Sequence, residues 1–258
     1  MTCFLAVVAF ILLPRTVESS PYFSTGEKDV ARRRAQDSIQ LEAEKFSWRS
    51  TLLPFLKAQT WLFGAMALSY GVACASVSNF LPTMIKRLAS ETVKTNLYTI
   101  APNLSGAIFI ITMCVLSDYF LQRALFIVLS TAVSMLGFVL LGSLDLTRRV
   151  GIGYFCTFLI TFGTFTSAVL VPAWASGNIM SRSERATTLG LISGLQNLGG
   201  IISSITFRSE DAPVYRPALI TSGVFQGSVV ILAAGAWAWY RKETRRVAQE
   251  DIVVKYVL

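Results

Sequence analysis

Charged residues divide this chain into six long uncharged runs, and this spacing constrains the fold more than any other feature. The runs cover residues 58–85, 95–117, 124–144, 150–181, 186–207 and 217–240, and each contains between 21 and 32 residues. A helix of about 20 residues crosses the hydrocarbon core of a bilayer. Because lipid cannot satisfy backbone hydrogen bonds, apolar segments of this length should be helical. We therefore predict an all-α polytopic membrane protein with six transmembrane helices.

Any one of these runs could be the buried core helix of a soluble protein, but six in succession with short polar connections could not. Only 15% of the residues are charged, whereas soluble domains carry about 25%. This composition argues against a soluble enzyme, a disordered protein and a coiled coil. The lipid bilayer is thus an expected partner.

The N-terminal part of the chain differs from the rest. Residues 1–13 are apolar but too short to span a bilayer, and we interpret them as a partial transmembrane helix, the end of a longer one. A signal peptide is the alternative, but residues 1–13 lack a basic n-region and no clear cleavage site follows. Residues 14–57 form a polar loop in which Ser24 and Glu27 fit a capping box that opens a helix extending to about Lys45.

The distribution of basic residues predicts the orientation in the membrane. Sixteen of the 23 Lys and Arg residues lie in loop 14–57, in the turns at 118–123 and 182–185, or in tail 241–258. The positive-inside rule places these segments in the cytoplasm and the six-helix bundle, residues 58–240, in the membrane. The same bias explains the net charge of +8, so no nucleic-acid partner is needed. We expect a multi-pass protein of the plasma membrane.

The side chains inside the runs exclude most catalytic chemistry. The chain has no histidine, no carboxylate lies in the middle of a run, and the four cysteines are dispersed. Acid–base or nucleophilic catalysis therefore lacks its usual groups, and a metal site is improbable. We predict that the protein is not an enzyme and that it needs no cofactor.

Polar uncharged residues recur at helical spacing in several runs. In run 186–207 they include Gln196 and Asn197, and in run 58–85 they form a mixed face from Tyr70 to Asn79. Such residues either line a water-accessible path or serve helix packing, and packing is favoured for the pair Gly199 and Gly200. For the two amides both interpretations remain open, because an amide in lipid is costly unless it faces protein or water. We interpret the prolines at 82 and 102 as helix punctuation.

The connecting segments resemble those of a known family. Residues 79–86 (NFLPTMIK) are similar to the family's exit from the seventh helix, and residues 117–123 (SDYFLQR) to the turn between the eighth and ninth, although Tyr119 replaces a usual basic residue. Trp174 and Asn178 fit its tenth-helix pattern P-x-x-A-W-x-x-x-N. The stretch that begins at Asn197 is similar to the eleventh helix. The chain thus resembles the C-terminal half of a major facilitator superfamily transporter, in the fungal allantoate-permease-like branch of the anion:cation symporters.

The resemblance implies a carrier that works by alternating access with its substrate between two six-helix halves. Its substrates would be small organic anions, such as carboxylated vitamins or ureides, moved with protons. The partner would be the missing N-terminal half or a second copy of this chain. Candidate cavity or gate residues are Tyr70, Asn79, Trp174, Asn178, Gln196 and Asn197, and Asp118 with Arg123 would form a cytoplasmic gate turn.

Two other functions remain open. The chain could be a truncated or partner-binding membrane fragment that transports nothing. A six-helix channel would need a charged or carbonyl-rich constriction, and the runs contain no recognisable ring of this kind.

Overall fold

The structure is a computed structural model that describes residues 24–30, 48–86, 92–143, 150–179, 181–212 and 214–249. It separates into two units, Met1–Ser47 and Trp48–Leu258, which are described individually. The predicted partial helix at 1–13, the polar helix beyond residue 30 and the end of the tail lie outside the described residues.

In the first unit, residues 25–30 form a helix that begins with the predicted capping box. The Ser24 backbone N–H donates to Glu27 Oε2 at 2.9 Å, and the Glu27 N–H donates to Ser24 Oγ at 3.4 Å. Each residue thus satisfies a backbone donor that the helix leaves open. The hydrogen bonds from the Ser24 N–H and hydroxyl lower the pKa of Glu27 below its ordinary value.

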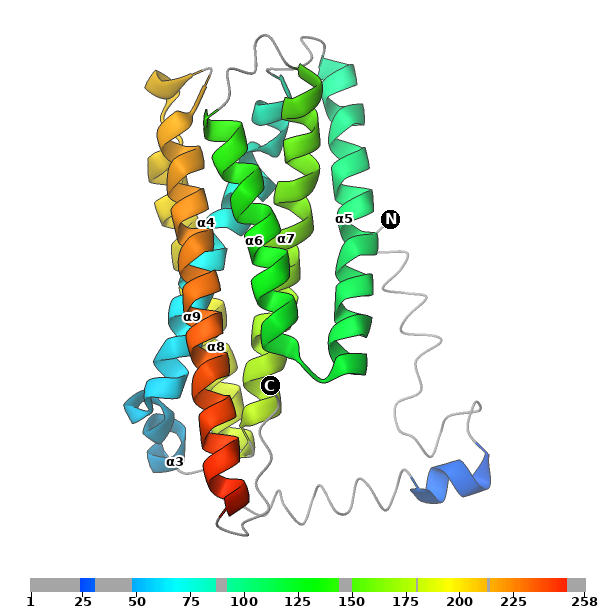
Figure 1. The fold of residues 1–258 in the computed structure, drawn as a ribbon, viewed down its shortest axis with the longest axis vertical. Coiled ribbons are helices and arrows are strands. Elements are labelled where there is room, and N and C mark those ends of the chain that lie inside the picture. The colour runs from blue at the N-terminus through cyan, green and yellow to red at the C-terminus, as the bar shows by residue number, and fades with distance from the viewer. Residues whose placement is uncertain are drawn as a thin grey trace. The chain divides into compact units, whose positions relative to one another are not determined.

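The second unit is a bundle of six long helices, shown in Figure 1. Short helices α3 (Trp48–Leu52) and η1 (Leu53–Leu56) precede the bundle, and η2 (Ser209–Asp211) lies in the connection between its last two helices. No strand occurs among the described residues. The six long helices are α4 (Ala58–Lys86), α5 (Thr92–Phe120), α6 (Arg123–Ser143), α7 (Val150–Asn178), α8 (Arg182–Thr206) and α9 (Arg216–Gln249).

All six predicted helices therefore form, and five of them are long and apolar enough to cross a membrane: α4, α5, α6, α7 and α9. The exception is α8, which has 25 residues but carries many polar side chains. Its length suffices for a crossing, so its composition, rather than its size, separates it from the other five. Together these helices make the chain an integral, multi-pass membrane protein.

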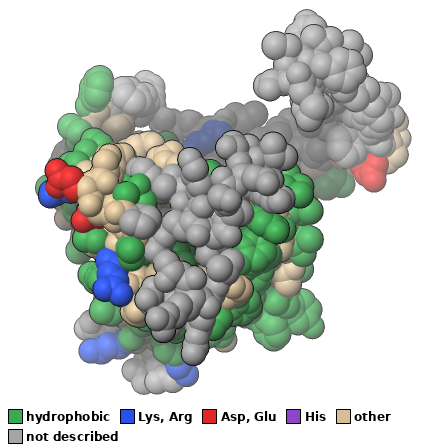
Figure 2. Space-filling model, turned by 90° about the horizontal axis from the view of Figure 1, so that it is seen from above, with side chains coloured by type: hydrophobic (Ala, Val, Ile, Leu, Met, Phe, Trp, Pro, Cys, Tyr) green, Lys and Arg blue, Asp and Glu red, His purple; other side chains and the backbone are tan. Residues whose placement is uncertain are grey.

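Helix α4 lies at the centre of the packing and contacts α7, α8 and α9, while α6 packs between α7 and α9. Helix α5 stands at the edge of the bundle in Figure 1 and packs mainly on α7, and most of its apolar stretch, Leu97–Phe120, is not buried. Figure 2 looks onto one end of the bundle and shows hydrophobic side chains along its rim, with charged side chains in a few small groups. The flank of α5 exposes large apolar side chains, among them Leu104, Ile108 and Ile111. Such a flank suits lipid or another membrane helix.

The prolines depart from the prediction, because Pro82 and Pro102 both lie inside helices rather than at their ends. A proline removes one hydrogen bond and frees the carbonyl four residues earlier. For Pro102 that carbonyl belongs to Tyr98, and it accepts a hydrogen bond from the Tyr154 hydroxyl at 3.1 Å. The neighbouring helix α7 thus compensates for the lost bond, which is how membrane helices tolerate an internal proline.

Candidate functional site

The closest approach of α4 and α8 brings two of the predicted cavity residues together. The Tyr70 hydroxyl donates to Gln196 Oε1 at 3.4 Å. Tyr70 is fully buried and Gln196 is half-buried, so the pair connects the core to the surface of α8. The helices approach closely because Gly199 lies against the α4 backbone: a Cβ there would stand 2.6 Å from the Val72 nitrogen.

Asn197 follows Gln196 and lies on the exposed face of α8 with Ser193 and Ser204. Its amide nitrogen donates to the Ser193 carbonyl at 2.8 Å, which is a bond within the helix. Polar groups on such a face are costly if they meet only lipid. This face is therefore suited to water or to another protein surface.

The outer faces of α6 and α9 differ from that of α8. Along residues 125–139 of α6 and 220–239 of α9 the large exposed side chains are apolar, among them Leu129 and Leu136 on α6 and Val224 and Ile231 on α9. The bundle thus has an apolar side, formed by these parts of α6 and α9. The exposed face of α8 is mixed, because it carries polar groups and also Leu198, Ile201 and Ile205. This asymmetry distinguishes surfaces for lipid from a surface for solvent or a partner.

Trp174 lies in the core of the bundle with no exposed surface. Its ring packs edge-on against Phe63 of α4 and Tyr240 of α9. The ring centroids are 5.4 Å apart in the first pair and 5.7 Å apart in the second. Contacts of this kind add to the energy of area burial. In this bundle Trp174 therefore joins α4, α7 and α9. Asn178, one turn further along α7, donates to the Trp174 carbonyl at 3.0 Å.

Asn79 is exposed and lies apart from the Tyr70–Gln196 pair. It stands nine residues beyond Tyr70 on α4, which corresponds to about 13 Å along the helix axis. The structure therefore gathers the predicted cavity residues into separate groups: Tyr70, Gln196 and Asn197 at the α4–α8 contact, Trp174 and Asn178 near the end of α7, and Asn79 alone.

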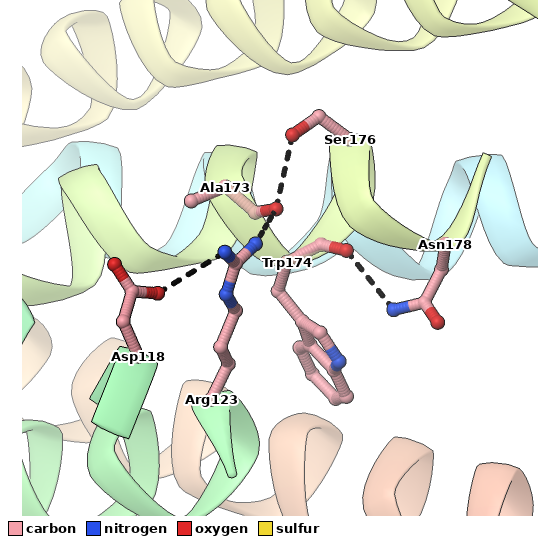
Figure 3. Close-up of polar contacts among 6 residues, drawn as sticks. All are labelled: Asp118, Arg123, Ala173, Trp174, Ser176 and Asn178. Atoms are coloured by element: carbon pink, nitrogen blue, oxygen red, sulfur yellow. Dashed lines mark hydrogen bonds and ion pairs between the residues drawn. The ribbon is translucent and has the colours of Figure 1, made fainter. Parts of the chain in front are cut away.

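The predicted gate turn connects α5 and α6, and Figure 3 shows its contacts. Arg123 Nη2 lies 3.2 Å from Asp118 Oδ1, and Arg123 Nη1 donates to the Ala173 carbonyl of α7. Leu121, between them, has a φ of 54°, a strained conformation for a residue with a branched side chain. The turn thus holds Arg123 against a carbonyl near the C-terminal end of α7, where the helix dipole favours a cation.

A buried polar cluster among α6, α7 and α9 was not among the predicted site residues. Gln226 of α9 is fully buried, and its amide nitrogen donates to Ser134 Oγ at 3.1 Å and to Thr164 Oγ1 at 3.2 Å. The two hydroxyls lie 2.7 Å apart. Gln226 is an amide within an uncharged run, so the argument applied to Gln196 and Asn197 could have identified it.

A second buried cluster joins α4, α8 and α9 through serine hydroxyl groups. Ser76 Oγ of α4 lies 2.9 Å from both Ser203 Oγ of α8 and Ser222 Oγ of α9. These hydrogen bonds link the three helices at the same depth in the bundle. They oppose separation of the helices from one another. Among the described residues, no three His, Cys, Asp or Glu side chains gather in a way that could hold a metal ion.

Comparison with known proteins identifies the family. Residues 1–204 match the model of the Major Facilitator Superfamily. The MFS-type transporter efuF of Hormonema carpetanum is 41% identical over 95% of this chain and 50% of its own length. The major facilitator-type transporter hxnP of Emericella nidulans is 35% identical over 97% of this chain and 51% of its own length.

A more distant relative has a named substrate. The high-affinity nicotinic acid transporter of Saccharomyces cerevisiae is 25% identical over 90% of this chain and 43% of its own length. The chain spans about half the length of these curated relatives. The family match covers most of the chain and agrees with the all-helical bundle, and the chain therefore belongs to the major facilitator superfamily.

Proposed function

We propose that this chain is the C-terminal half of a secondary carrier that moves a small organic anion, such as a carboxylated vitamin or a ureide, together with protons. The resemblance to the anion:cation symporters supports the branch and the coupling. The nicotinic acid transporter among its relatives supports a carboxylated substrate. The half-length match supports a partner half, either an N-terminal six-helix half or a second copy.

One observation carries the proposal: α8 exposes the Asn197 amide and two serine hydroxyls beside apolar side chains, whereas along residues 125–139 of α6 and 220–239 of α9 the large exposed side chains are all apolar. An amide such as that of Asn197 gains most if it faces a water-filled cavity between two halves. A substrate that binds in the cavity displaces this water, and neutral donors can then orient its carboxylate without a buried cation, because hydrogen bonds strengthen where water is excluded. Gln196 and Asn197 are the proposed contacts.

Alternating access then requires this half to rock as one body against its partner. The Ser76 and Gln226 clusters and the Trp174 packing hold the helices of the half together, so its internal structure would persist during the motion. The Asp118–Arg123 turn would be a latch that stabilises one conformation. No Asp, Glu, Lys or Arg lies in the middle of the described helices, and the proton-binding group would therefore belong to the partner half.

The proposal includes an orientation, with the latch turn, the start of α8 and the C-terminal tail in the cytoplasm and the protein in the plasma membrane. The excess of Lys and Arg in these segments supports this direction.

Uptake measurements in cells test the proposal. Labelled nicotinate and other small carboxylates would be offered to cells that express this chain, and to cells that express it extended upstream through any open reading frame. We expect uptake only with the extended chain, and acceleration of uptake at acidic external pH. Equal uptake by both forms would refute the need for an N-terminal half and would leave a second copy as the partner, and uptake insensitive to pH would refute proton coupling.

The half-length match also favours a second candidate, a membrane fragment that binds a partner and transports nothing. This candidate predicts no uptake by either form. It also predicts that the chain is recovered in a complex with another membrane protein.

A further inference from the structure

The segment that precedes α4 exposes large apolar side chains to an unusual degree. Over Trp48–Lys57 the exposed fraction is 57% for Leu52, 50% for Leu53 and 84% for Leu56. Pro54 is buried, and Thr51 is half-buried. The segment therefore has an inner face toward the bundle and an outer apolar face, which is the arrangement of an amphipathic element.

The inner face is attached to the start of α8. Lys57 Nζ forms an ion pair with Glu184 Oε1 at 2.6 Å, and the Thr51 and Ser183 hydroxyl oxygens lie 3.4 Å apart. Glu184 is in the first turn of α8, where the helix dipole favours a carboxylate. These contacts fix which face of the segment points outward.

The position of the segment sets its depth relative to a membrane. It continues directly into α4, one of the helices suited to cross the bilayer. Trp61, in the first turn of α4, is 51% exposed, and its indole N–H donates to the Phe55 carbonyl at 2.8 Å. Tryptophans at the ends of membrane helices lie at the level of the lipid headgroups. The segment is therefore held at the same level.

We propose that residues 48–57 form an interfacial anchor, with Leu52, Leu53 and Leu56 inserted into the lipid surface and Lys57 held by α8 at the boundary. Charge supports a lipid occupant, since the same end of the bundle carries the exposed basic residues Arg182, Arg241 and Lys242. The exposed ring of Trp61, which follows the segment at the start of α4, supports it as well. The anchor ties the start of α8 to the membrane surface, so it would limit how far that end of α8 moves.

A soluble protein partner fits the segment less well. Leu56 is exposed at the level of the lipid headgroups, so lipid lies next to it without any partner having to bind. Burial of a leucine side chain in lipid is favourable. A second copy of the chain is the remaining occupant, and the experiment separates it from lipid.

Spin labels measure the depth of the segment directly. The full chain, with its four cysteines replaced by alanine, would carry one new cysteine at Leu56 and be reconstituted in phosphatidylcholine vesicles containing phosphatidylserine. Collision rates with oxygen, which partitions into lipid, and with a water-soluble nickel chelate report the environment. Leu129→Cys on the exposed face of α6 is the lipid reference, and Glu210→Cys in η2 is the aqueous reference.

We expect the label at Leu56 to collide with oxygen several-fold more often than the label at Glu210, and with the nickel chelate several-fold less often. Rates equal to those at Glu210 would overturn the proposal. A label shielded from both reagents, with spin–spin broadening between chains, would assign the surface to a second copy and also overturn it. Leu53→Cys repeats the test if the Leu56 variant does not reconstitute. These outcomes do not depend on transport.

Discussion

Replacing Gly199 by alanine tests the close approach of α4 and α8. The added Cβ would lie 2.6 Å from the Val72 nitrogen and 2.7 Å from the Leu68 carbonyl oxygen. Both atoms belong to the α4 backbone and cannot rotate away. Because ordinary contacts are about 3.5 Å or longer, the helices would have to separate by about 1 Å.

The expected cost follows from overpacking, which destabilises by about 1–3 kcal/mol. The neighbouring Gly200 provides a matched control, since its added Cβ would meet only Ala75 Cβ at 3.7 Å. Both variants gain the same helix propensity from alanine, about 0.5–1 kcal/mol in favour of the helix. The propensity gain cancels in the comparison, and Gly199→Ala should be the less stable variant by about 1–3 kcal/mol.

Thermal unfolding of the detergent-solubilised chain measures the difference. Each kcal/mol of lost stability lowers the unfolding midpoint by about 2–4 °C in a chain of this size. The midpoint for Gly199→Ala should therefore lie several degrees below that for Gly200→Ala. Gly194→Ala, where nothing lies within 4 Å of the added atom, should behave like Gly200→Ala. Equal midpoints for all three variants would refute the reasoning, because they would mean that α4 and α8 do not touch at Gly199.

Other substitutions test the remaining contacts. Gln226→Met should lower the free energy of unfolding by no more than about 1 kcal/mol, because the two hydroxyls that the amide contacts still bond to each other; a larger loss in denaturant titration would show that the amide is essential. Arg123→Ala should lower the thermal midpoint more than Asp118→Ala, since the exposed ion pair is worth less than about 1 kcal/mol while the arginine also serves a helix carbonyl; the reverse order would contradict this geometry. The pKa of Glu27 measured by NMR should lie below that of an unstructured glutamate. The helix at 25–30 should weaken as the pH falls through that pKa, because only the ionised carboxylate stabilises it in this way. An ordinary pKa would exclude the capping box. Asn197→Leu should reduce uptake by the extended transporter with little change in its thermal midpoint, and unchanged kinetics would assign Asn197 to packing.

Features that depend on nearby residues could be predicted without the fold. The uncharged runs predicted six long helices, because chain length and charge spacing decide whether a segment can enter lipid. The capping box at Ser24 is equally local, since its partners are three residues apart. The contacts of Asp118 with Arg123 are another case, because the two residues flank one turn.

Contacts between distant helices could not be predicted in the same way. The prolines at 82 and 102 lie inside helices, whereas the sequence predicts them at helix ends. At Pro102 the Tyr154 hydroxyl, 56 residues away from Tyr98 along the chain, binds the Tyr98 carbonyl that the proline leaves free. The role of Gly199 in close packing and the looser position of Gly200 also required the structure.

The sequence by itself determined the class of the protein, an α-helical membrane protein, because hydrophobic length and charge position act residue by residue along the chain. Only the tertiary structure decided which polar groups meet. It paired Tyr70 with Gln196, placed Trp174 in the core, left Asn79 apart and buried Gln226 among hydroxyls. The physical reason is that the rotation of each helix and its approach to its neighbours depend on packing between residues far apart in sequence, and helical periodicity alone does not specify that packing.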